Sequence, residues 1–187
     1  MITAQRAREL LSLHGELRSQ PASDWSGAFD LPACAERFYE EIGPTDVFVE
    51  SYGNPFFFPR LTALWDFQAG YRWNGLNGEP IADRDDDWLV IADEGGDPFI
   101  VSRSSGVVLH AEHGAGVWTP SRLFLDLNTM AACLGCLGEV VHHGGGELTD
   151  LDCFIRTEHL VRAHAGLREF LNSPEDATYV LNVLGWA

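Results

Sequence analysis

Lysine is absent from this chain of 187 residues, so all twelve basic residues are arginines. They stand against 28 acidic residues, which leaves a formal charge of −16 and a pI near 4.6. Cationic side chains supply the affinity for nucleic acid and for anionic membrane surfaces. The charge therefore disfavours both as partners. It is compatible with a strongly basic protein partner, although high negative charge also simply favours solubility.

The sequence also lacks a long apolar run and an export signal. No run approaches the roughly 20 residues that a membrane-spanning helix needs. The N-terminus, MITAQRARELL, has neither an apolar core nor a small-residue cleavage site, so we expect a cytoplasmic protein. The hydrophobic share of 45% and the aromatic share of 11% predict a folded chain, most simply one domain over residues 1–187.

Motifs of the common enzyme classes are missing as well. The chain has no G-x-S-x-G elbow, no dinucleotide-binding glycine fingerprint and no cysteine with an evident histidine signature. Cys133 and Cys136 form a C-x-x-C, but they recur with leucines at helical spacing. That spacing favours two small core residues of a helix over a zinc or redox site. We therefore expect no cofactor, no metal and no enzymatic activity.

Hydrophobic periodicity predicts helices towards both ends of the chain and strands in the middle. We expect helices over residues 3–19, 31–44, 59–73, 120–142, 156–172 and 174–184. Strands are expected over residues 46–53, 87–95, 97–103 and 106–113, with a further short piece at 116–119. Links as short as Gly95–Gly96 join consecutive strands in antiparallel fashion. The sequence therefore predicts an α+β fold, an antiparallel meander flanked by helices.

Two acidic stretches are candidate sites. Asp83, Asp85 and Asp87 resemble the start of a calcium loop, and Glu94 agrees with its twelfth position, but Trp88 replaces the glycine expected at the sixth. We therefore favour an exposed acidic loop that forms part of a docking surface.

The second stretch carries Asp93, Glu94 and Asp97 around the two glycines. Strand alternation places Asp93 and Glu94 on opposite faces, so they do not act together on one substrate bond. The polar tip of a hairpin is the favoured interpretation. The alternative is a small metal-dependent hydrolase that uses the acids between Asp83 and Asp97.

Two histidine pairs are further candidates. His142 and His143 precede three glycines, but a phosphate loop joins a strand to a helix, whereas this loop leaves a helix. We interpret the pair as a helix C-terminus. His110 and His113, together with Glu112, support a metal hypothesis, and we favour solvent-facing side chains on a strand instead.

Aromatic residues are concentrated between Tyr52 and Gly75, where eight occur in 24 positions. Phe56, Phe57 and Phe58 follow one another between two prolines and cannot all face inward. Tyr71, Trp73 and Trp88 neighbour the acidic loop. Aromatic and arginine side chains among acids are typical of protein-binding surfaces, and core packing is the competing interpretation.

Taken in order, four stretches resemble the SUKH superfamily, the Smi/Knr-type cell-wall assembly regulators. They are LPACAERFYEEIGP, YGNPFFFPRLTALWDFQAGYRW, DWLVIADEGGDPFIVS with SGVVLHAEHG, and SRLFLDLNTMAACLG. The resemblance covers about Trp25 to Gly138. It implies a non-enzymatic α+β domain, and most bacterial members resemble immunity proteins that neutralise toxins, often nucleases. Other members act as regulatory or scaffolding modules. The helix ending in EIGP lacks the usual Gly-Gly.

These expectations define a candidate binding surface. The domain core spans about residues 25–138, with an N-terminal helix at 3–19 and a helical extension at 145–187 that has no counterpart in the minimal family domain. We expect a basic toxin domain as partner, and no nucleic acid or membrane. The predicted partner-binding residues are Tyr71, Trp73, Asp83, Asp85, Asp86, Asp87, Glu94 and Asp97.

Overall fold

The computed structural model describes residues 2–114 and 117–187. Over these residues the chain forms an α+β fold of six strands and five α-helices, which confirms the predicted class. The strands are β1 Val47–Val49, β2 Phe56–Phe58, β3 Trp88–Glu94, β4 Asp97–Ser102, β5 Val108–His110 and β6 Ser121–Phe124. The α-helices are α1 Ala4–Leu11, α2 Ala33–Glu41, α3 Leu127–Gly144, α4 Thr157–Leu167 and α5 Pro174–Val183. Short 3-10 helices lie at η1 Ala22–Asp24, η2 Leu61–Ala63, η3 Asp66–Gln68 and η4 Gly145–Glu147.

The strands form one antiparallel sheet in the order β1-β2-β3-β4-β5-β6, so each strand pairs with the next along the chain. The two-residue link between β3 and β4 is possible because Gly95 and Gly96 both adopt positive φ angles, 62° and 106°. The predicted meander is therefore confirmed, and beyond the three best-supported segments, β3 to β5, it extends by two strands on one side, β1 and β2, and by one on the other, β6.

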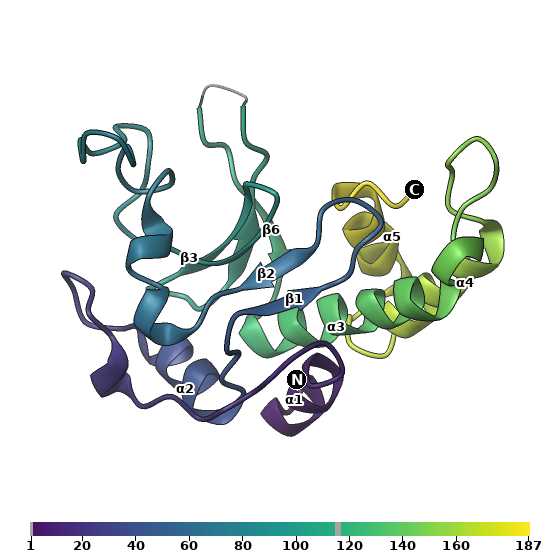
Figure 1. The fold of residues 1–187 in the computed structure, drawn as a ribbon, viewed down its shortest axis with the longest axis horizontal. Helices are drawn as coiled ribbons and strands as arrows, with labels where there is room; N and C mark the ends of the chain where they lie inside the picture. Colours follow the sequence, from purple (N-terminus) through teal and green to yellow (C-terminus); the bar gives the residue numbers. More distant parts are fainter. Residues whose placement is uncertain (1, 115–116) are drawn as a thin grey trace.

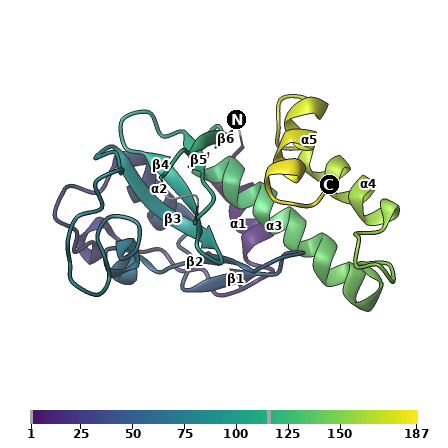
Figure 2. The same ribbon diagram turned by 90° about the horizontal axis from the view of Figure 1, so that it is seen from above.

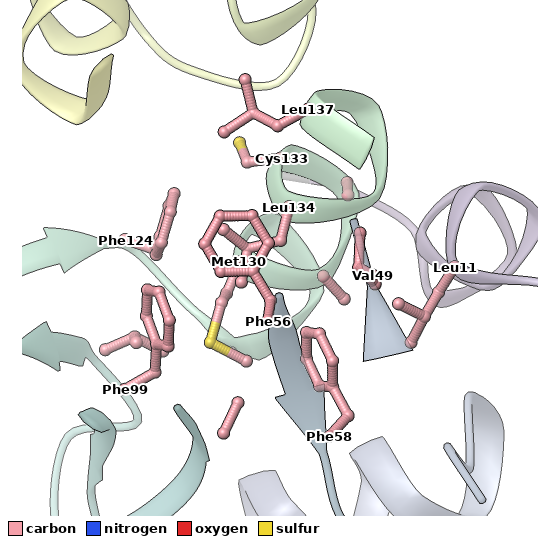
Figure 3. Packing of buried hydrophobic residues seen from close by; sticks show 14 of the residues in the cluster. Leu11, Val49, Phe56, Phe58, Phe99, Phe124, Met130, Cys133, Leu134 and Leu137 are labelled. Carbon is pink, nitrogen blue, oxygen red and sulfur yellow. The ribbon is translucent and has the colours of Figure 1, made fainter. Parts of the chain in front are cut away.

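Helices α1, α2 and α3 cover one face of this sheet and appear below the strands in Figure 1. Strand alternation turns Phe56 and Phe58 towards them, while Phe57 points to the opposite face. In the core, Met130 and Leu134 of α3 point towards the rings of the sheet (Figure 3).

The C-terminal extension is continuous with this core. Helix α3 starts beside β6, passes α1 and ends beside α4 (Figure 2). Ser173 caps α5 by accepting from the amide of Asp176, and Pro174 occupies the first turn, as the sequence indicates. The buried side chains of Leu167, Val180 and Trp186 belong to the same hydrophobic cluster as the sheet.

The prediction of a helix over residues 59–73 is wrong. This stretch contains only η2 and η3, because the buried side chain of Gln68 pairs with the main chain of β3 instead of facing a helix partner. Its amide nitrogen donates to the carbonyl of Val90 at 2.9 Å, and its oxygen accepts from the amide of Val90 at 3.1 Å. Gln68 thus supplies hydrogen-bond partners for the main chain of Val90, at a point of β3 that β2 does not pair with.

Boundaries elsewhere also differ from the predictions; helix α4, for instance, ends at Leu167 and not at residue 172. The first helix ends at Leu11, because residues 16–20 run extended and hydrogen-bond to residues 39–45, as between the Arg18 amide and the Gly43 carbonyl at 2.8 Å. The helix expected from residue 120 begins only at Leu127, after β6, because Asp126 caps it. The short strand expected at 116–119 begins outside the described residues, and 117–119 form no strand.

Candidate functional site

The predicted site residues separate into two groups at the two ends of β3. Asp83, Asp85, Asp86 and Asp87 precede the strand, whereas Glu94 is its last residue and Asp97 begins β4 after the two-residue link, about 20 Å away at about 3.3 Å per residue. The acids therefore do not converge on one substrate bond. Within residues 2–114 and 117–187, no group of three or more His, Cys, Asp or Glu side chains is placed to hold a metal ion.

The first group, which we call the acidic segment (residues 83–87), presents its charge to solvent. The Asp86 side chain is 86% exposed, and its carboxylate lies 2.6 Å from Arg84 and 3.6 Å from Arg72. The side chains of these two arginines are only 20% and 11% exposed. Asp83 and Asp85 are exposed as well. The anions thus face outward and the cations lie beneath them, so the surface is negative despite the nearby arginines.

Two half-buried arginines also hold the main chain at the end of the acidic segment. Arg72 donates to the carbonyl of Trp88 at 2.7 Å, and Arg103 donates to that of Asp86 at 3.0 Å. Both guanidinium groups lie over the ring of Phe29, at 4.9 and 3.8 Å. Burial, reinforced by the charge of Arg84, lowers the pKa of Arg72. These contacts hold the main chain at Asp86 and Trp88 in place.

Asp87 differs from its neighbours because its carboxylate is occupied inside the fold. It accepts from the hydroxyl of Ser102 at 2.6 Å and from the amide of Ser104 at 2.8 Å. Burial opposes ionisation of Asp87, but these hydrogen bonds outweigh it and lower the pKa. Asp87 consequently joins the start of β3 to the end of β4, whereas Asp83, Asp85 and Asp86 are exposed to solvent.

The two predicted aromatic residues take different positions. The Tyr71 side chain lines a hollow on the sheet face opposite α3, together with Arg72, Arg84, Asp85, Trp88 and Trp118. The free space in it is about 20 Å³, the room of about one water molecule. Trp73 instead packs against Trp65 at 5.0 Å, in a cluster with Trp25 and Phe29 that supports the base of the segment. The hollow, as it stands, is too small for a substrate.

The second group lies at the β3–β4 hairpin. Asp93 accepts from the Tyr71 hydroxyl at 2.7 Å, and Glu94 accepts from Ser51 at 3.1 Å. The paired residues of β2, Phe57 and Phe56, lie on opposite faces, so the expected separation of Asp93 from Glu94 is confirmed. The carboxylates of Asp93 and Glu94 both accept hydrogen bonds from other residues of the fold.

The histidines near this hairpin differ from expectation in one case. His113 is exposed, and its amide and Nδ1 both lie 2.6 Å from the Asp97 carboxylate. His110 was expected to face solvent, which is wrong: it is 5% exposed and packs against Phe99 at 5.0 Å. Its position opposite Phe99 in β4 turns it to the helix-covered face. His142 and His143 lie in the last turn of α3, as predicted.

Glu94 makes the stability of the protein depend on pH. Burial, with a further contribution from the Asp97 charge, raises the pKa of Glu94 to about 7. Between the ordinary glutamate pKa and 7, the folded state therefore binds more protons than the unfolded state, and stability falls as pH rises. We expect Glu94→Gln, which keeps the acceptor for Ser51, to raise the free energy of unfolding by about 2 kcal/mol at pH 8 and by much less at pH 4. Urea denaturation at both values measures this.

The exposed Glu40→Gln serves as the control for that experiment, since it makes the same change on the surface of α2. We expect no pH-dependent gain from it. If Glu94→Gln raised the free energy of unfolding equally at both pH values, folding would not raise the pKa of Glu94.

Arg72 and Arg103, stacked over Phe29 beneath the acidic segment, form a cluster that we call the clamp, and the sequence did not predict it. Phe29, Arg72 and Arg103 are separated by more than 30 residues each, so no local spacing indicates their contact.

No helix in the described part of the chain has the length and apolar character required to cross a bilayer. In comparisons with family models, curated proteins and solved structures, nothing matches this chain.

Proposed function

We propose that this protein is a non-enzymatic binding module that occludes a basic protein partner, and that it acts as an immunity protein which neutralises a toxin domain by one-to-one binding. One observation carries the proposal: the acidic segment exposes Asp83, Asp85 and Asp86, while the side chains of Arg72 and Arg84 are only 11% and 20% exposed. Recognition of a cationic surface is the chemistry that this arrangement supports.

Two physical effects favour such recognition. The net charge of −16 attracts a basic partner over a distance and raises the association rate. The hydrogen bonds from Arg72 and Arg103 fix the segment in advance, so binding loses little conformational entropy there. Stoichiometric occlusion needs no catalytic group, which agrees with the separation of the acids along β3.

The resemblance to the SUKH superfamily supplies the choice of a toxin as partner. A regulatory scaffold would use the same surface with another basic protein, and the genes beside this one separate these roles. A large polymorphic toxin gene next to it favours immunity. Its absence favours the scaffold.

The test is a calorimetric titration against the catalytically inactivated toxin domain encoded beside the gene, from about 0.05 to about 0.5 M salt. We expect a one-to-one complex that weakens as salt increases, because exposed charges are screened. No binding over the whole range would contradict the immunity function. Binding that is independent of salt would contradict recognition through the acidic segment.

A further inference from the structure

Five aromatic side chains form an unbroken row on the sheet face opposite α3. The row, which we call the aromatic row, consists of Phe48, Phe57, Phe67, Tyr71 and Trp118. From the first ring to the last, successive centroids are 4.5, 5.6, 5.8 and 5.9 Å apart. These spacings are those of rings in direct contact.

Strand alternation places the row on that face. Val47 and Val49 of β1 are buried in the core beneath the sheet, so Phe48 between them points away from it. Phe57 does the same in β2, directly opposite Phe48. The small buried cluster on this face, Val90, Ile100 and Ala111, is surrounded by loop and strand residues. Among the residues that the structure describes, it includes none from α1–α5.

The row is partly exposed and firmly held. Phe48, at one end of the row, is 58% exposed. The other four rings are half-buried. The hydroxyl of Tyr71 is fixed by Asp93 at 2.7 Å. Large apolar rings that are already ordered bury much surface at little entropic cost when a partner covers them.

The aromatic row also meets the acidic segment. Tyr71 and Trp118 line the same hollow as Asp85, so the row ends where the exposed carboxylates begin. A stable protein interface has the same plan, an apolar and aromatic centre beside a charged rim. Charge therefore selects the occupant of this face: a partner whose surface is basic.

Resting on the proposed function, we propose that the aromatic row is the apolar centre of the interface with the basic toxin domain. The partner contributes arginine and apolar side chains, which stack on the rings while further cationic groups meet Asp83, Asp85 and Asp86. The two parts act differently: the acids govern the encounter and respond to salt, and the rings govern the lifetime of the complex and do not.

Two phenylalanines in similar surroundings allow a matched test. We expect Phe48→Ala to weaken binding of the inactivated toxin domain about 10-fold, by a similar factor at about 0.05 and about 0.5 M salt. Phe154 is 69% exposed and lies in the loop before α4, away from the row. Phe154→Ala is therefore expected to bind as the wild type does. Trp118→Ala, at the other end of the row, is a second variant with an expected loss, should Phe48→Ala unfold.

The outcomes separate this inference from the proposed function. If Phe48→Ala and Trp118→Ala bind normally while removal of the acids weakens binding, the aromatic row is not in the interface, and the proposed function stands. An equal loss in Phe154→Ala would likewise overturn the inference. If the wild-type protein does not bind the toxin domain at all, the proposed function fails first.

Discussion

The triple variant Asp83→Asn, Asp85→Asn, Asp86→Asn is expected to associate with the basic toxin domain about 30-fold more slowly than the wild type at low salt. Asparagine keeps the shape of each side chain and removes its charge. The three carboxylates are the exposed part of the acidic segment, whereas Arg72 and Arg84 stay largely buried and add their positive charge to the surface potential once the acids are gone. Stopped-flow association rates at about 0.05 and about 0.5 M salt measure the effect, and the difference should nearly vanish at the higher concentration.

A second triple variant shows whether the position of the charges matters. Asp152→Asn, Glu158→Gln and Glu175→Gln change the net charge equally, at exposed positions in and before α4 and α5. These helices lie at the opposite end of the molecule from the segment (Figure 1). We expect only a small slowing from this control. Equal slowing by both variants would mean that the net charge of the protein, and not the acidic segment, attracts the partner.

Gly43→Ala is expected to lower the free energy of unfolding by at least about 3 kcal/mol. Gly43 has a φ of 66°, which residues other than glycine rarely adopt, and it lies in the turn that ends α2. A Cβ there would lie 1.9 Å from the carbonyl oxygen of Arg18 and 2.8 Å from that of Tyr39. Both are main-chain atoms, so the junction between residues 18 and 43 would have to open. Chemical denaturation of the wild type and the variant measures the loss.

Gly185→Ala provides the matched control, because Gly185 has nearly the same φ, 68°, and no atom within 4 Å of an added Cβ. Its cost reports the backbone strain alone, about 1 kcal/mol. The excess in Gly43→Ala then reports the close approach of the two chain segments. Similar costs for both variants would contradict that close packing.

Local signals explain why the middle of the sheet was predictable. β3, β4 and β5 combine β-branched and aromatic residues with short glycine-containing turns, and each of these features acts within a few residues. β2 lacks such a signal, because Phe56–Phe58 lies between prolines and becomes a strand only by pairing with β1 and β3. The stretch at 59–73 has helical periodicity, but the buried bonds of Gln68 to Val90 override it.

The candidate site was predictable only in part for the same reason. Charge alone placed Asp83, Asp85 and Asp86 on the surface. The internal role of Asp87 depends on Ser102 and Ser104, and the clamp depends on Phe29 and Arg103, all of which are brought together by tertiary contacts. The sequence grouped Glu94 and Asp97 with the acidic segment because they are near in the chain, whereas the length of β3 separates them.

Hydrogen–deuterium exchange of the protein, free and in complex with the inactivated toxin domain, locates the surface that recognises the partner. We expect binding to slow exchange at the main-chain amides of the acidic segment and of Trp118, which lines the same hollow as Asp85. The amides of α4 and α5, at the other end of the molecule, should exchange as they do in the free protein. Slowed exchange confined to α4 and α5, with residues 83–87 unchanged, would contradict recognition through the acidic segment.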